Sequence, residues 1–274
     1  METESEIKIP NVWESIFSRL YETPENSQNV EVSPDLSELH RANVSEARVV
    51  VFGGNRVGKS TFNKWIINKL LDNAAAASSD DQDPFVVYID LDPGQAEFTP
   101  PGVISVLRIT DHVNGPNLSH LTTPILSKFI GSLNVSDCVQ TYLRCTEEIF
   151  QFLNSDESYK NVPWVVNTMG FSRGLGVLLA NLTICLSNPN VVIQIGLDGV
   201  QGEDKRTFPW LLKEDAVRNY VNNNLRSDRH RINANSLKAY QFISINSVFC
   251  DLLEHVRSKL FPGLSPFHQS GWLQ

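Results

Sequence analysis

Cysteine is scarce in this sequence, and positive charge is in short supply. The 274 residues include only 4 cysteines, and no two of them form a C-x-x-C pair. This argues against a disulfide-stabilised fold and a zinc site, and favours reduced thiols in a nuclear or cytosolic compartment. Because 31 acidic residues outnumber 23 basic ones, the formal net charge is −8. Any contact with nucleic acid therefore requires a local basic patch.

Long hydrophobic runs are also missing. No stretch reaches the ~20 apolar residues needed to span a bilayer, so we expect no membrane segment. The acidic start, Met1–Glu6, lacks the apolar core of a secretory signal peptide. There is no internal repeat and no N-K-x-D motif, the usual mark of guanine-specific enzymes, which makes a GTPase a weak alternative. With 41% hydrophobic residues, the composition suits one large globular α/β domain.

The most informative stretch is a glycine-rich turn between an apolar run and a helix-like pattern. It fits G-x-x-x-x-G-K-[ST], the phosphate-binding loop (P-loop). Its glycines let backbone N–H groups turn toward phosphate oxygens, and the following helix directs its positive dipole end at the same anion. In such loops the lysine reaches the β- and γ-phosphates and the hydroxyl residue after it binds Mg²⁺. We predict ATP or GTP binding by Gly53, Gly54, Asn55, Arg56, Val57, Gly58, Lys59, Ser60 and Thr61.

Two acids follow the next apolar run. Residues 85–90 predict a buried strand, which ends in Asp90-Leu91-Asp92 before a Pro-Gly turn. Ligands bind at the carboxyl ends of strands in open parallel sheets, and side chains two apart on a strand share a face. We therefore expect Asp90 and Asp92 to approach the phosphate site, one ordering Mg²⁺ and the other accepting a proton from an attacking hydroxyl. The competing interpretation, turn-forming acids, is weakened by their position after a P-loop.

Strands and helices alternate along most of the chain. Apolar runs predict strands at 47–52, 85–90, 102–110, 162–167, 191–195 and 239–245. Helical spacing predicts helices at 59–72, 135–154, 177–186 and 248–260, with a short amphipathic patch at 12–21. This alternation predicts an α/β fold of the P-loop NTPase type, with a mostly parallel sheet and helices on both faces.

The segment 203–231 is charged and mixed, and its densest basic cluster is 226–231. One interpretation is a solvated helix face, as most charge runs are. The other is a lid that closes arginines over the transferring phosphate, since guanidinium groups suit that role. The lid candidates are Arg226, Arg229 and Arg231.

Together these motifs resemble the polynucleotide 5′-hydroxyl kinases, and more closely their nucleolar branch in pre-ribosomal RNA processing than the branch in mRNA 3′-end formation and tRNA splicing. The most specific match is D-L-D-P-G-Q-A-E-F-T-P-P-G at 90–102. The P-loop and Phe129-Ile130-Gly131 also match, as do Asn167-Thr168-Met169-Gly170 and the Gly174-x-Gly176 that follows. The resemblance implies transfer of the γ-phosphate of ATP, with Mg²⁺, to the 5′-hydroxyl end of RNA. It further implies an endoribonuclease as a partner in pre-rRNA processing. It also implies localisation to the nucleus and, within it, to the nucleolus.

The resemblance also implies roles for individual residues. Lys59 and Ser60 hold phosphate and metal. Asp92 is the general base, because in relatives the first acid of the pair varies more in type, and Asp90 supports metal or water. Gln95 lies beside the acceptor, and the substrate region includes Thr168 and Phe171. Relatives carry Trp where this chain has Phe171, whose ring either stacks on a nucleobase or belongs to the core.

The resemblance suggests a P-loop kinase domain at 47–260 including the lid, a polar extension at 1–46 and a tail at 261–274. Relatives carry a β-rich domain before this core and another after it, so the chain is interpreted as a minimal member, a splice form or an incomplete gene model. Two further functions stay open. One is a catalytically weak ATP-binding scaffold of a ribosome-biogenesis complex, and the other is a small-molecule kinase, since a P-loop does not identify the acceptor.

Overall fold

The computed structural model describes residues 11–21, 43–77, 83–115, 119–196, 210–224 and 236–246. Its strands are β1 (Arg48–Gly53), β2 (Val86–Asp90), β3 (Val103–Ile109), β4 (Leu126–Phe129), β5 (Trp164–Asn167), β6 (Val191–Gly196) and β7 (Gln241–Asn246). Its helices are α1 (Asn11–Tyr21), α2 (Lys59–Ala77), α3 (Val139–Ser155), α4 (Leu175–Ser187) and α5 (Glu214–Asn224). Three short 3₁₀ turns are η3 (Val44–Glu46), η5 (Val135–Asp137) and η6 (Glu157–Tyr159).

A seven-stranded sheet organises the fold, in the order β4-β3-β2-β5-β1-β6-β7. The strands from β2 to β7 in this order are parallel, whereas β3 is antiparallel to β2 and β4 is antiparallel to β3. The prediction of a mostly parallel α/β sheet is therefore confirmed. Strand β4 was not predicted, because it is a four-residue edge strand whose side chains alternate between half-buried and exposed.

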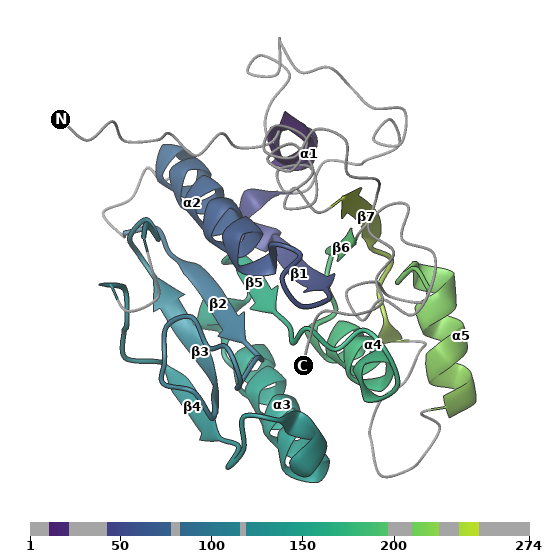
Figure 1. Ribbon diagram of the computed structural model, residues 1–274. Helices are drawn as coiled ribbons and strands as arrows, with labels where there is room; N and C mark the ends of the chain where they lie inside the picture. Colours follow the sequence, from purple (N-terminus) through teal and green to yellow (C-terminus); the bar gives the residue numbers. More distant parts are fainter. Residues whose placement is uncertain are drawn as a thin grey trace, which may run out of the picture.

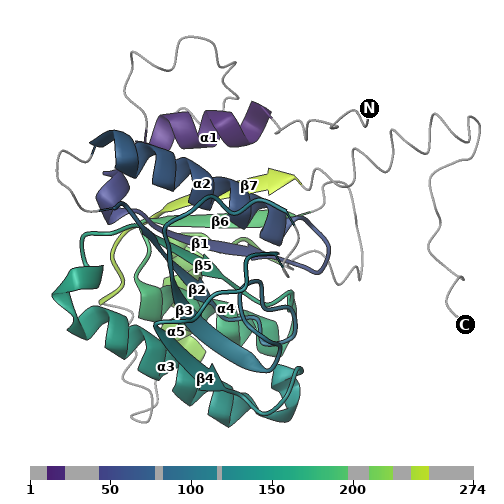
Figure 2. The same cartoon turned by 90° about the vertical axis from the view of Figure 1, so that its left-hand side faces the viewer.

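Both faces of the sheet are buried, which explains the continuous apolar runs. In β1, Val49 and Val51 join the core beneath α1 and α2, while Val50 and Phe52 join the core beneath α3 and α4. Figures 1 and 2 show α1 and α2 on one side of the sheet and α3, α4 and α5 on the other. Strands buried on both faces lose the polar alternation of a half-exposed strand, as the sequence indicates.

Helix α1 completes one of the two cores. Trp13, Phe17 and Tyr21 recur every four residues, so they lie on one face of the helix and are buried. The Trp13 ring packs edge-on against Phe62 of α2, with centroids 5.0 Å apart, and Phe17 packs edge-on against Trp65 at 6.0 Å. The amphipathic patch at 12–21 is therefore a helix that packs on the P-loop helix.

Some predicted features fall outside the described residues. These are the helix at 248–260, the tail at 261–274 and the basic cluster with Arg226, Arg229 and Arg231. Among the residues that the structure does describe, no helix has both the length and the apolar character needed to cross a bilayer.

We expect the Phe17→Ala variant to lose about 3–5 kcal/mol of unfolding free energy, because it removes a fully buried ring from the α1–α2 contact. Urea denaturation measures this loss. The control is Leu121→Ala, whose side chain is 53% exposed and should change stability by about 0.5 kcal/mol or less. Equal stability of the two variants would mean that α1 contributes nothing to the fold.

Candidate nucleotide-binding and acceptor site

The P-loop joins β1 to α2 at the carboxyl edge of the sheet, and its backbone explains two of its glycines. A Cβ atom at Gly53 would lie 2.7 Å from the carbonyl oxygen of Ile195 in β6, so no side chain fits there. Gly58 has φ = 101°, which side chains strongly disfavour. These constraints keep the loop close to the sheet and place its amides at the start of α2.

The Lys59 side chain is bonded within its own loop. Only 9% of the residue is exposed, and its Nζ donates a hydrogen bond to the carbonyl oxygen of Gly54 at 2.9 Å. Burial lowers the pKa of Lys59 to about 8, and the charge of Asp92 opposes that shift. Ser60 and Thr61 follow on the first turn of α2 and are exposed. The ammonium and the Ser60 hydroxyl are thus at the helix N-terminus, where an anion binds.

The loop after β5 lies directly on the P-loop. A Cβ atom at Gly170 would sit 1.9 Å from Oδ1 of Asn55, so only glycine fits this contact. Thr168 is buried, and its hydroxyl donates to the carbonyl oxygen of Val51 at 2.7 Å. The Thr168 side chain therefore ties β5 to β1.

Asp90 is 1% exposed, and three donors reach its carboxylate. Oδ1 accepts from Nδ2 of Asn167 at 2.9 Å and from the amide of Asp92 at 3.2 Å, and Oδ2 accepts from the amide of Glu97 at 2.9 Å. Burial raises the pKa of Asp90 to about 7, although these hydrogen bonds oppose the shift. Asn167 in turn accepts from Nδ2 of Asn63 on α2 at 2.9 Å. Asp90 therefore holds together β2, β5 and the loop at 91–102, here called the acidic loop, and it is linked to α2 through Asn167.

Asp92 lies in a different environment, because β2 ends at Asp90 and the chain then turns. Its Oδ1 accepts from the amides of Gly94 at 3.0 Å and Gln95 at 3.1 Å. Burial raises the pKa of Asp92, while the charge of Lys59 lowers it. The hydrogen bonds described for this side chain fall on Oδ1, which leaves Oδ2 to receive an incoming group. The two acids therefore have different surroundings, and the separate roles predicted for them stay predictions.

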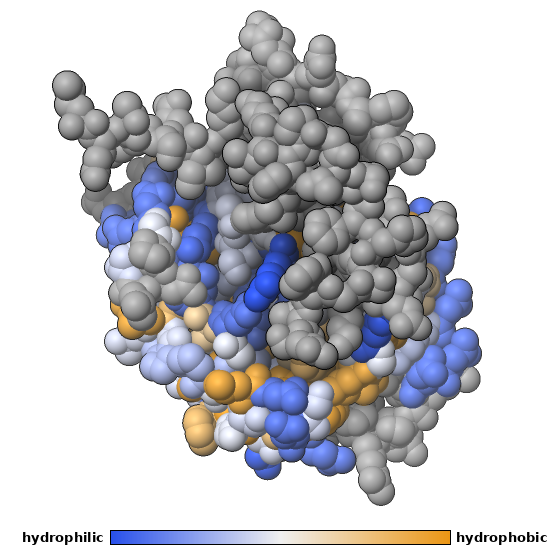
Figure 3. All heavy atoms as spheres, in the orientation of Figure 1, coloured by the Kyte–Doolittle hydropathy of each residue, from blue (hydrophilic) through white to orange (hydrophobic). Residues whose placement is uncertain are grey.

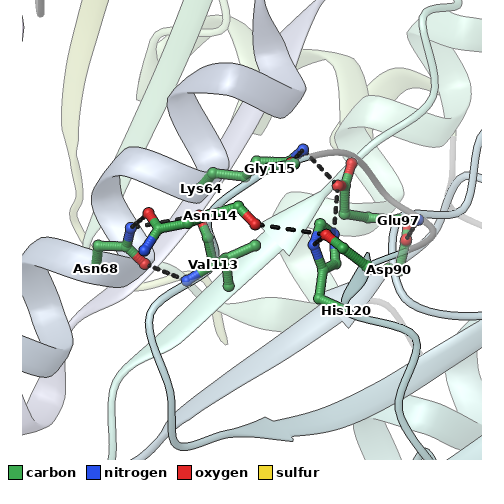
Figure 4. A network of polar contacts seen from close by, with 9 residues as sticks. Lys64, Asn68, Asp90, Glu97, Val113, Asn114, Gly115 and His120 are labelled. Atoms are coloured by element: carbon green, nitrogen blue, oxygen red, sulfur yellow. Dashed lines mark hydrogen bonds and ion pairs between the residues drawn. The ribbon is translucent and has the colours of Figure 1, made fainter. Parts of the chain in front are cut away.

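A buried ion cluster fixes the loop that carries these acids. Oε1 of Glu97, whose side chain is 4% exposed, lies 2.7 Å from Nζ of Lys64 on α2 and 2.7 Å from Nε2 of His120. Lys64 also donates to the carbonyl oxygen of Gly115 at 3.0 Å. Figure 4 shows these side chains converging from α2, the acidic loop and the segment after β3. Sequence reasoning missed this cluster, although Glu97 lies within the matched run 90–102.

The remaining predicted residues differ in how far the structure places them. Gln95 is exposed beside Asp92. Phe171 is half-buried against the core beneath α3 and α4, and it lines a small pocket with Phe52 and Tyr142. Phe171 therefore contributes to the core and still shows part of its ring.

The P-loop, its buried lysine and the acids at and just after the end of β2 define a P-loop nucleotide-binding protein. Residues 53–242 match the family model described as mRNA cleavage and polyadenylation factor CLP1 P-loop, and the chain belongs to this family.

Several curated proteins are similar to this chain. The Drosophila melanogaster polynucleotide 5′-hydroxyl-kinase NOL9 is 30% identical over 66% of this chain and 17% of its own length. The Homo sapiens protein of the same name is 33% identical over 68% of this chain and 24% of its own length. The chain therefore spans less than a quarter of these two relatives. One chain of a solved Clp1p–Pcf11p complex aligns with this protein. The alignment covers 81% of this chain and 51% of that chain, at 21% sequence identity and a TM-score of 0.46.

We expect the nucleotide affinity of the free protein to fall as the pH rises above about 8. Lys59 loses its proton there, whereas bound phosphate favours the charged ammonium and raises its pKa. The dissociation constant should therefore rise by up to about tenfold per pH unit. A titration with fluorescent nucleotide between about pH 7.5 and 9.5 measures this, above the range in which phosphate itself titrates near pKa 6.

Two variants identify the group responsible. Lys59→Ala should bind weakly at every pH without this dependence, and Lys213→Ala, which changes an exposed lysine before α5, should keep it. A pH dependence that persists in Lys59→Ala would assign it to another group.

Proposed function

We propose that this protein is an ATP-dependent polynucleotide 5′-hydroxyl kinase that transfers the γ-phosphate of ATP to the 5′-hydroxyl end of RNA. The observation that carries the proposal is the placement of Lys59, at the start of α2, and Asp92, just after β2, near enough that each charge acts on the pKa of the other. Lys59 is a phosphate-binding group and Asp92 is a proton acceptor, and both lie at the carboxyl edge of the sheet. The kinase names of relatives that match two thirds of the chain add support.

In the proposed reaction, the 5′-oxygen attacks the γ-phosphorus, and the bond to the bridging oxygen of ADP breaks. The proton of the attacking hydroxyl passes to Oδ2 of Asp92. Burial raises the pKa of this carboxyl group toward the neutral range, so that it is a stronger base than an ordinary carboxylate. Lys59 exchanges its bond to Gly54 for the phosphates and neutralises charge that develops on them.

The Ser60 hydroxyl, exposed at the start of α2, fits the P-loop ligand for Mg²⁺, which would neutralise further phosphate charge. The Asp90 carboxylate is less well suited than the Ser60 hydroxyl to coordinate Mg²⁺ directly. Three donors already occupy its carboxylate, which has about four lone-pair sites. We therefore propose that Asp90 positions the acidic loop, and its predicted role as a metal ligand stays a prediction.

We further propose a role in rRNA processing in the nucleolus, with an endoribonuclease as partner. The resemblance of the run 90–102 to the nucleolar branch supports this assignment. The kinase unit is proposed as residues 47–260, together with α1, which packs on the P-loop helix. The alternative is an ATP-binding scaffold with little turnover.

We expect Lys59→Ala to lower phosphate transfer to a 5′-hydroxyl RNA by about 100- to 1,000-fold, because it removes a charge that stabilises the transition state. Labelled ATP, Mg²⁺ and a short RNA measure this, with circular dichroism to show an intact fold. The matched control is Lys213→Ala. A folded Lys59→Ala variant with full activity would contradict the assignment. A wild-type protein that binds ATP but labels no RNA would favour the scaffold.

We expect Asp92→Asn to lower kcat by about 100- to 10,000-fold while ATP binding is kept, because the amide cannot accept the proton. Asp90→Asn should mainly lower stability, since an amide presents donors where the carboxylate accepts three hydrogen bonds. Single-turnover transfer and urea denaturation separate the two effects. If Asp90→Asn alone abolished transfer in a stable protein, the two roles would be exchanged.

A further inference from the structure

One residue of the P-loop has a backbone conformation that its side chain disfavours. Arg56 has φ = 61°, in the left-handed region. Among the described residues other than glycine, only Asn188 also has a positive φ, and Asn188 is the left-handed cap that ends α4. Asparagine tolerates this conformation better than a long side chain such as that of arginine. Residues held in such a conformation cluster at functional sites, so the backbone of Arg56 indicates a function.

The residues on either side of Arg56 hold it in this conformation. Val57 is 1% exposed and belongs to the core beneath α1 and α2. Asn55 packs against Gly170 in the loop after β5, where its side chain fills the space that a larger residue at 170 would need. Arg56 lies between these two contacts and is exposed. The P-loop is therefore fixed before and after Arg56, while the Arg56 side chain stays at the surface.

This side chain starts within the loop that binds the phosphates. Arg56 precedes Lys59 by three residues, so their Cα atoms are at most roughly 11 Å apart. A guanidinium acts on phosphate through direct hydrogen bonds, and beyond contact its charge is felt across about one Debye length, about 8 Å at physiological salt. In Figure 3, the centre of the described surface is strongly hydrophilic, in the place where Figure 1 draws the P-loop and the start of α2.

The charge of Arg56 is not used by the rest of the described fold. Lys64, on the first turns of α2, is paired with Glu97 at 2.7 Å. For the Arg56 side chain, no ion pair or hydrogen bond is found within the part of the chain that the structure describes. Burial lowers the pKa of Lys59 to about 8, whereas arginine keeps its charge throughout this pH range. Arg56 therefore adds a permanent positive charge to the P-loop.

We propose that the Arg56 guanidinium is a second cationic ligand of the nucleotide phosphates, beside the Lys59 ammonium. The inference rests on the ATP binding of the proposed function and not on RNA as the acceptor. As a ligand of the bound nucleotide, the guanidinium stabilises the ground state and the transition state alike, so it lowers the Kd and KM for ATP without raising kcat. The disfavoured backbone of Arg56 is kept because it places this charge in the loop.

The test measures the binding of fluorescent ATP to wild type, Arg56→Gln and Arg56→Lys, with tripolyphosphate as a competitor. At about 0.1 M salt, Arg56→Gln should raise the Kd for ATP by about 10- to 100-fold, because it removes a charged donor. Arg56→Lys keeps the charge and should restore part of the affinity. The loss in Arg56→Gln should shrink at about 1 M salt, where the Debye length is about 3 Å. Tripolyphosphate should lose affinity by a similar factor.

Two further variants separate the charge from the backbone and from surface charge in general. Glycine adopts a positive φ freely, so Arg56→Gly should keep or raise the urea midpoint of wild type and still bind ATP as weakly as Arg56→Gln. Arg144→Gln, which removes an exposed arginine on α3, should bind ATP like wild type. At saturating ATP, the kcat of Arg56→Gln for RNA should stay within about threefold of wild type.

Wild-type affinity for ATP in a folded Arg56→Gly or Arg56→Gln variant would overturn the proposal and leave Arg56 as a turn residue. A loss for fluorescent ATP without a loss for tripolyphosphate would also overturn it, since the guanidinium would then contact the base or the ribose. So would a fall in kcat at unchanged Kd. If wild type binds no ATP, the proposed function itself fails. If wild type binds ATP but labels no RNA, only the acceptor is wrong, and the binding measurements still test Arg56.

Discussion

The burial of the Asp90 carboxylate is the constraint on which the site depends. A carboxylate without water is stable only when its oxygens are hydrogen-bonded, and here the donors come from Asn167, Glu97 and the chain at Asp92. Meeting that requirement fixes the end of β5 and the course of the acidic loop relative to β2. The burial that raises the pKa of Asp90 thus also places Asp92 where the chain leaves the sheet.

The cluster around Glu97 extends this constraint to α2. Its ion pair with Lys64 joins the acidic loop to the helix that begins at Lys59, and Asn63 joins the same helix to Asn167. The nucleotide side and the acceptor side of the site are therefore bonded to one another through buried polar contacts. Phosphoryl transfer depends largely on positioning, so this rigidity serves the reaction proposed here.

The sequence predicted the P-loop, the parallel strands and the acidic pair, because each is a local pattern set by backbone geometry or burial. It did not predict β4, where Ser127 and Lys128 break the apolar run of an edge strand. The buried polar contacts of the site could not be predicted from local patterns, because their partners are distant in the sequence. Asn63 and Asn167, for example, are 104 residues apart. The different surroundings of Asp90 and Asp92 could not be predicted from the two-residue alternation, because β2 ends at Asp90 and the chain then turns.

The contact between Gly170 and Asn55 has a consequence for how this site evolves. Each residue occupies the space that a larger neighbour would need, so the loop after β5 and the P-loop cannot vary independently. A larger residue at 170 is tolerated only together with a smaller one at 55. Substitutions at positions 55 and 170 therefore have to occur together. A P-loop grafted from another fold would fit only if the loop after β5 were replaced with it.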